Sequence, residues 1–154
     1  MNRHRNDGID PVARSRSRRR ALQAIYAWQL SATSEGALIA EFAHEQAHEI
    51  ADLEYFEDLV RGVLRHVAQL DAALADFLDR RVDEVDLIER AALRIAAYEL
   101  LHRPDVPYRV VINEAIDSGV ETVIAITEGI PVMDMLPTYW RAKEKGVTLI
   151  GPNC

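Results

Sequence analysis

Apolar residues recur every three or four positions from about residue 14 to residue 118, which is the spacing of helices that bury one face. The longest run steps from Leu53 to Phe77 and predicts one continuous helix of about seven turns with a single apolar stripe. Four shorter runs predict further helices, over residues 14–30, 37–48, 83–101 (with Asp83 as its cap) and 108–118. The fold is therefore predicted to be a mainly α-helical bundle.

The pattern changes after Gly119. Residues 120–127 are apolar and β-branched without alternation, which is typical of a strand buried on both faces in a parallel sheet. A turn, a helix that runs to Lys145 and a second short strand over residues 147–150 follow. Pro137 removes an amide within that helix, so the helix is expected either to kink or to begin there. The sequence therefore predicts a β-α-β unit, of α/β type, appended to the helical bundle.

Positive charge is concentrated at the start of the chain. Residues 1–20 hold seven arginines against two aspartates, whereas the chain of 154 residues has a net charge of -7. Residues 1–13 are polar and without period, which predicts a disordered basic arm. Arg14 and Arg18 fall in phase with the apolar face of the first helix, so that the start of this helix is expected to overhang the core or to stay unfolded. A basic segment on an acidic body favours contact with a polyanion.

The composition excludes several classes of protein. With 49% hydrophobic and 28% charged residues, the chain has the make-up of a soluble globular protein. No apolar run approaches the ~20 residues that cross a bilayer, so no membrane contact is predicted. The single cysteine, Cys154, cannot close an internal disulfide, which favours a reducing cytoplasm. No Ser/His/Asp or Cys/His arrangement is supported, so the chain is predicted not to be an enzyme and to need no cofactor.

One short motif has the form of a metal site. Residues 44–48 read HEQAH, which fits the zinc-protease pattern of two histidines four apart on a helix beside a glutamate. Glu49 adds a charge where such helices carry uncharged residues, and no third ligand stands out downstream. The favoured interpretation is a solvated helix face, so no metal is predicted.

Four stretches of the chain resemble one family in the family's own order. They are RRRALQAIYAWQL (18–30), YFEDLVRGV (55–63), IERAALRIAAYEL (88–100) and DVPYRVVINEAI (105–116). Together they resemble the NusB family of bacterial transcription antitermination factors over about residues 12–116. The resemblance implies a NusB-like helical bundle over residues 14–116.

The NusB resemblance also implies partners and a binding surface. In that family the arginine-rich first helix contacts boxA RNA of ribosomal and phage leader transcripts, together with NusE, which is also a small-subunit ribosomal protein. The matching positions, which the resemblance assigns to RNA binding, are Arg14, Arg16, Arg18, Arg19 and Arg20. Guanidinium groups pair bidentately with phosphate and stack on unpaired bases, which agrees with that role.

The end of the chain resembles a different family. The stretches EAIDSG (114–119), ITEGIPVMDML (126–136) and GPNC (151–154) are similar to the α subunit of succinyl-CoA synthetase. This resemblance predicts a chimera joined near Ile116, with residues 117–154 as the synthetase-like segment. Residues 126–128 match a segment that contacts coenzyme A in that family. The Gly-rich loop and the phosphorylated catalytic histidine of the synthetase have no counterpart here, so neither coenzyme A binding nor ligase activity is expected.

The predicted function is a non-catalytic RNA- and protein-binding module of the transcription antitermination type. The alternative is an engineered or evolved chimeric fold hybrid with no retained activity, and a coenzyme A-dependent ligase fragment or a zinc hydrolase ranks last. Two short strands alone leave an unpaired edge. They are also only marginally stable in water, where three or more strands are usually needed. A homodimer that pairs its strands through residues 117–154 is therefore also predicted.

Overall fold

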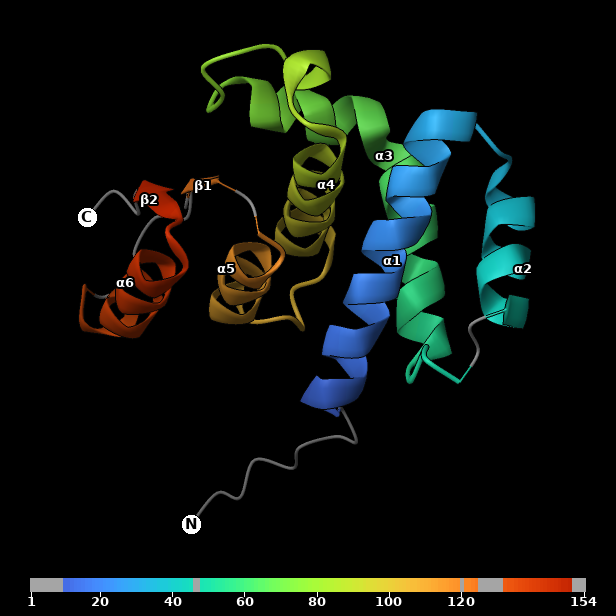
Figure 1. Ribbon diagram of the computed structural model, residues 1–154, viewed down its shortest axis with the longest axis horizontal. Helices are drawn as coiled ribbons and strands as arrows, with labels where there is room; N and C mark the ends of the chain where they lie inside the picture. Colours follow the sequence, from blue (N-terminus) through green and yellow to red (C-terminus); the bar gives the residue numbers. More distant parts are fainter. Residues whose placement is uncertain (1–9, 46–47, 120, 125–131, 151–154) are drawn as a thin grey trace. The chain divides into compact units, whose positions relative to one another are not determined.

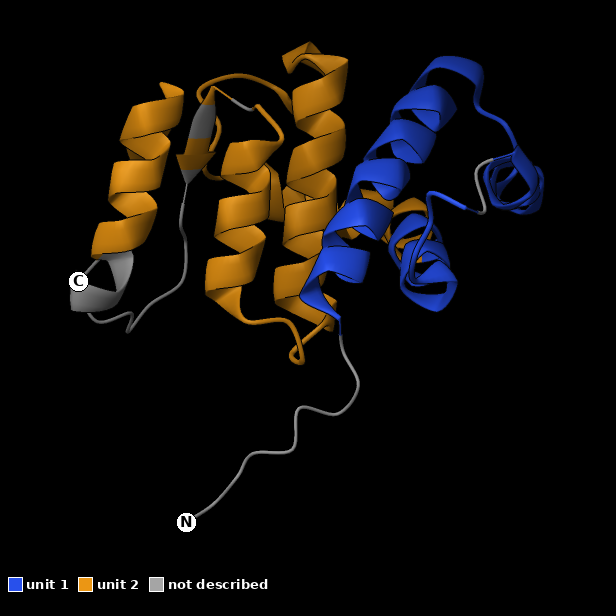
Figure 2. Ribbon diagram, turned by 60° about the horizontal axis from the view of Figure 1, so that its bottom comes forward, with its two compact units in different colours: residues 1–61 blue, residues 62–154 orange. Residues whose placement is uncertain are grey.

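The computed structural model describes residues 10–45, 48–119, 121–124 and 132–150 of the chain (Figure 1). Within those ranges the protein is mainly helical, as the apolar periodicity predicts. Its elements, in chain order, are α1 (Pro11–Ser31), α2 (Glu35–Glu45), α3 (Leu53–Ala75), the 3-10 helix η1 (Val82–Glu84), α4 (Leu87–His102), α5 (Tyr108–Asp117), β1 (Thr122–Ile124), α6 (Val132–Lys145) and β2 (Thr148–Ile150). Two compact units are formed, one within residues 1–61 and one within residues 62–154 (Figure 2).

The first helix begins where a capping residue and a proline stand together. The Asp10 carboxylate accepts a hydrogen bond from the Val12 amide at 2.9 Å, and Pro11 occupies the start of the helix, where its missing N–H leaves no partner unsatisfied. Residues 11–13, which were predicted to belong to a disordered arm, are therefore helical, because this local cap starts the helix before the apolar period begins. Residues 1–9 lie outside the described residues.

The first unit is built from α1, α2 and the beginning of α3. Phe42 of α2 and Phe56 of α3 stack with their ring centroids 6.3 Å apart. Leu53, predicted to begin the apolar stripe of α3, is exposed at the first position of the helix. The buried apolar side chains of the unit come from all three helices and include Ala21, Ala24, Ile25, Leu38, Ile39, Phe42, Tyr55, Phe56, Leu59 and Val60.

In the second unit, a partly buried ion pair joins the end of α3 to α4. The Arg94 guanidinium donates two hydrogen bonds of 2.8 Å to the Asp71 carboxylate, and Arg94 is buried. Gly62 packs against Tyr98 so closely that a Cβ at this position would collide with the ring. Helix α3 ends before Phe77, which is exposed, so the predicted apolar stripe stops short of that residue.

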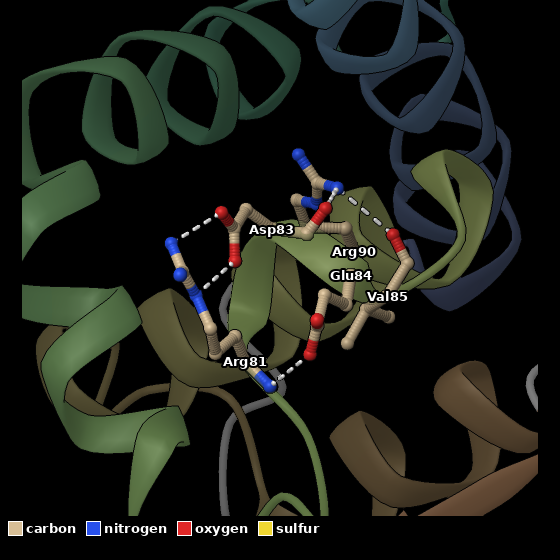
Figure 3. A network of polar contacts seen from close by, with 5 residues as sticks. All are labelled: Arg81, Asp83, Glu84, Val85 and Arg90. Carbon is tan, nitrogen blue, oxygen red and sulfur yellow. Dashed lines mark hydrogen bonds and ion pairs between the residues drawn. The ribbon is translucent and has the colours of Figure 1, made fainter.

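Polar contacts hold the turn between α3 and α4 (Figure 3). The Arg90 guanidinium of α4 donates to the backbone carbonyls of Asp83 and Val85, at 2.7 and 2.9 Å. The Arg81 amide donates to the Glu84 carboxylate at 3.1 Å. These bonds satisfy backbone groups that would otherwise lack partners in the turn.

Asp86 caps α4, and the prediction that Asp83 does so is wrong. The Oδ1 atom of Asp86 accepts the amides of Ile88 and Glu89, at 2.9 and 3.4 Å. Asp83 lies in η1 instead, where its carboxylate accepts from Arg81 at 2.7 Å. Both aspartates carry the same local capping signal, and the fold of the turn decides between them.

The last described elements follow the predicted strand-helix-strand order. Strands β1 and β2 are parallel neighbours, with Thr122 opposite Thr148 and Ile124 opposite Ile150. Helix α6 contacts α5 and β2, and α5 contacts β1. These elements therefore belong to the same compact unit as α5, and nothing in the described residues sets them apart as an appended domain.

Both strands span three residues in the described part of the chain. The remainder of the first predicted strand, which was placed over residues 120–127, lies mostly outside the described residues. Helix α6 begins at Val132, so that Pro137 lies inside the helix. The alternative in which this helix begins at Pro137 is therefore wrong, because the helix already has its first turn before the proline removes an amide.

Candidate nucleic-acid interface

Helix α1 distributes its arginines over two sides. Arg16 and Arg19 are exposed, and in the described part of the chain neither side chain takes part in a hydrogen bond or an ion pair. They lie three residues apart, and the exposed Gln23 follows four residues later, so these side chains share one face of the helix. We call Arg16, Arg19 and Gln23 the outer stripe of α1.

Arg14 and Arg18 lie on the opposite side of α1. Their guanidinium carbons lie 4.5 and 5.2 Å from the ring centroid of Tyr55, which is itself buried. Arg18 is only 6% exposed. The expectation that this helix start overhangs the core or stays unfolded is therefore wrong, because a guanidinium is weakly hydrated and can stack on an aromatic face inside a protein.

Arg20 lies between the two sides and is already engaged. Its guanidinium forms an ion pair with Glu49 and donates a hydrogen bond of 2.8 Å to the Gln23 side chain. The imidazole of His48 lies 3.7 Å from the same Glu49 carboxylate. Arg20 is therefore less available to a phosphate than Arg16 and Arg19 are.

A buried serine fixes the rotation of α1. Ser17 is fully buried, and its Oγ donates to the Asp52 carbonyl at 2.9 Å while accepting from the Asp52 amide at 3.0 Å. The Asp52 carboxylate in turn accepts the Tyr55 amide at 3.0 Å, as the N-terminal cap of α3. This chain of bonds holds one side of α1 inward and leaves the outer stripe facing water.

Residue patterns along α1 alone do not reveal Ser17, Asp52 and Tyr55 as the residues that orient the arginines. The one available signal is an aspartate placed directly before the apolar run of α3, which marks a capping residue. The contact from Ser17 to Asp52 joins positions 35 apart in the chain. A periodicity argument has no access to a contact of that range.

Other sequence motifs assemble no site in the described residues. The histidines of the HEQAH motif, His44 and His48, are exposed, and residues 46–47 lie outside the described residues. Across the described ranges, no group of three or more His, Cys, Asp or Glu side chains is placed to hold a metal ion. No helix within the same ranges has both the length and the apolarity to cross a membrane. The synthetase-like residues 126–128 and Cys154 also fall outside the described residues.

The fold and this surface define a small, mainly helical protein with an oriented arginine stripe. Residues 15–123 match the NusB family. The chain is 60% identical over 148 residues to "Transcription antitermination protein NusB" of Xanthomonas axonopodis pv. citri (strain 306), covering 94% of this chain and 92% of that protein. It is 61% identical over 146 residues to the protein of the same name from Xanthomonas oryzae pv. oryzae (strain PXO99A), covering 92% of each. The chain therefore belongs to the NusB family, and the predicted class, a transcription antitermination factor, is confirmed.

These matches give no support to the predicted chimera. The family match continues to residue 123, beyond the junction predicted near Ile116. A match that covers 94% of the chain also includes most of residues 117–154. Short stretches near the end of the chain are similar to succinyl-CoA synthetase. This local similarity does not change the family to which the chain belongs.

Proposed function

We propose that this protein acts in transcription antitermination by binding boxA-type RNA through the outer stripe of α1. The observation that carries the proposal is the division of the arginines in α1. Two of the five candidate residues, Arg16 and Arg19, are exposed and uncommitted among the described residues, whereas Arg14 and Arg18 lie over Tyr55. The RNA-contacting set is accordingly Arg16 and Arg19, with Arg20 at its edge.

The chemistry of the outer stripe suits single-stranded RNA. A guanidinium donates two parallel hydrogen bonds to phosphate and also stacks on unpaired bases. Because α1 is held by the Ser17 and Asp52 hydrogen bonds, the two arginines are presented on a rigid element, which lowers the entropy lost on binding. The function is binding alone, and no bond is made or broken in it.

NusE is the proposed protein partner. The NusB resemblance implies it, and exposed apolar side chains on the second unit offer surface for a protein contact. Ile88 and Leu101 of α4 and Val110 of α5 are among the exposed large apolar residues. Co-elution of purified NusE with the full chain in gel filtration, with and without RNA, tests this part of the proposal, and separate elution in both conditions would contradict it.

The RNA part is tested by fluorescence anisotropy with a labelled boxA-type RNA over a series of salt concentrations. The Arg16→Ala/Arg19→Ala variant is expected to bind more weakly throughout and to lose about 0.7 in salt slope for each phosphate contact removed. The matched control is Arg80→Ala/Arg81→Ala, which removes the same charge from exposed positions elsewhere. Equal affinity and equal slope in the two variants would show that the outer stripe is not the RNA-binding surface.

A further inference from the structure

Helix α6 exposes an aromatic face that the α1 interface does not explain. Leu136, Tyr139, Trp140 and Lys143 follow one another at helical spacing and are all exposed, with Tyr139 at 48% and Trp140 at 55%. The opposite face of the helix carries Thr138 and Ala142, which are buried. The protein therefore directs two aromatic rings into water from one side of α6, and we call these four exposed residues the aromatic stripe.

A single cation belongs to the aromatic stripe. The Lys143 ammonium lies 5.0 Å from the ring centroid of Trp140, and the rings of Tyr139 and Trp140 meet edge to face with centroids 5.7 Å apart. Among the described residues Lys143 forms no ion pair. The stripe therefore combines two stacking surfaces with one available positive charge.

The other cations at the end of α6 are held by the neighbouring helix. Arg141 donates to the Asp117 carboxylate of α5 through two nitrogens, and donating this hydrogen bond to Asp117 raises the pKa of Arg141. The Lys145 ammonium lies 4.0 Å from the same carboxylate. These contacts attach α6 to α5, which lies beside it (Figure 1), and leave Lys143 as the described cation of α6 that no carboxylate pairs.

The size of the aromatic stripe decides which kind of occupant it fits. A stable protein interface, including a contact between two copies of this chain, uses about 20–30 residues on each side, whereas the stripe has four residues on one helix within the described part of the chain. Stacking of an unpaired base on one aromatic side chain is a contact on the scale of a single residue. An ammonium beside the ring then meets the phosphate that follows the base, which matches the charge of RNA.

We propose that the aromatic stripe of α6 is a second RNA contact, in which Trp140 and Tyr139 stack unpaired bases and Lys143 binds the adjacent phosphate. The proposal rests on the proposed function in one respect, namely that RNA is the ligand of the protein. All of its residues belong to the second unit, so it can fail or hold independently of the outer stripe. Because every base has a stacking face, this contact tolerates different sequences.

The first experiment separates stacking from charge in the full chain. Trp140→Ala is expected to weaken binding of a labelled single-stranded boxA-type RNA by about fivefold or more, without a change in salt slope. Lys143→Gln is expected to flatten the slope by about 0.7. The matched control is Phe77→Ala, which removes another exposed aromatic side chain of the same unit and is expected to bind RNA as the unchanged chain does.

The second experiment reads Trp140 directly. The chain has two tryptophans, so that Trp28→Phe leaves Trp140 as the single reporter. Single-stranded oligouridylate and boxA-type RNA are expected to quench its fluorescence saturably, whereas duplex RNA of the same length is not. If Trp28→Phe does not fold, anisotropy with Trp140→Ala in the otherwise unchanged chain still decides the question.

The outcomes distinguish the two proposals. RNA binding that is lost in Arg16→Ala/Arg19→Ala but unaffected by Trp140→Ala, with no quenching, overturns the second contact and leaves the outer stripe standing. The reverse pattern overturns the outer stripe alone. Trp140 emission that depends on protein concentration without RNA, together with a Trp140→Ala change in sedimentation, makes the aromatic stripe a contact between copies and also overturns the proposal.

Discussion

Helices α1 and α6 each place a cation over an aromatic ring, but the surroundings of the two contacts are opposite. In α1, the guanidinium groups of Arg14 and Arg18 lie over Tyr55, which is buried. In α6, the Lys143 ammonium lies over Trp140, which is more than half exposed. The first contact is therefore part of the interior, whereas the second leaves both partners accessible to a ligand.

The choice of cation agrees with these surroundings. A guanidinium is planar and weakly hydrated, so it can give up water and stack inside a protein, whereas an ammonium is strongly hydrated and stays at the surface. The comparison shows that an arginine in an arginine-rich segment is not by that fact a ligand-binding residue. Within α1, the side of the helix on which an arginine lies separates the buried arginines from those proposed to bind RNA.

The largest expected effect is the loss of stability when the buried ring of Tyr55 is removed. Tyr55→Ala removes the aromatic surface beneath Arg14 and Arg18 and leaves a cavity, so it is expected to lower the free energy of unfolding by about 3 kcal/mol or more. Tyr139→Ala, the exposed counterpart on α6, is expected to change it by no more than about 0.5 kcal/mol. Urea unfolding followed by circular dichroism measures both, and similar losses in the two variants would remove the distinction between interior and surface contacts.

A smaller effect separates two neighbouring arginines of α1. Arg18→Ala removes a desolvated stacking contact and is expected to lower the free energy of unfolding by about 2 kcal/mol. Arg16→Ala is expected to leave stability within about 0.5 kcal/mol and to weaken RNA binding instead. Urea unfolding and RNA-binding anisotropy, measured on both variants, check that one variant loses stability and the other loses RNA affinity. An Arg18→Ala protein that stays fully folded yet loses RNA affinity would place Arg18 in the RNA-binding set.

The smallest expected effect concerns Arg20, which belongs to neither side. Glu49→Gln removes the carboxylate that pairs with Arg20, so that the guanidinium becomes available to phosphate. Because a partly exposed ion pair contributes at most about 1 kcal/mol, RNA affinity is expected to rise by no more than about fivefold, with a salt slope steeper by about 0.7. The matched control is Glu54→Gln, an exposed glutamate of α3. Equal gains in the two variants would indicate a general charge effect rather than release of Arg20.

Local patterns in the sequence account for most of the helices. The apolar periodicity places α3, α4 and α5 within a few residues of their observed bounds, because each helix buries one face over several turns. Local patterns leave the helix ends less certain. Asp83 and Asp86 carry the same capping signal, but Asp86 is the residue that caps α4. The turn that places it there is held by the hydrogen bonds from Arg90 to the backbone carbonyls of Asp83 and Val85.

The candidate interface was predictable as a segment but not as a surface. Five arginines close together predict a basic helix start, and phase along the helix correctly puts Arg14 and Arg18 on the apolar side. Their burial depends on Tyr55, and the rotation of α1 depends on the bond from Ser17 to Asp52. These contacts join residues more than thirty positions apart and carry no periodic signal.

The exposed face of α6 is a second surface that residue spacing alone does not predict, because its side chains lie in water rather than in the interior. Residue spacing establishes that Leu136, Tyr139, Trp140 and Lys143 share one side of a helix. It cannot say whether that side meets the core, because an aromatic stripe reads the same whether it is buried or exposed. The packing of Thr138 and Ala142 into the interior, with Asp117 holding Arg141, turns the aromatic side outward, since a helix that buries one face must present the other to water.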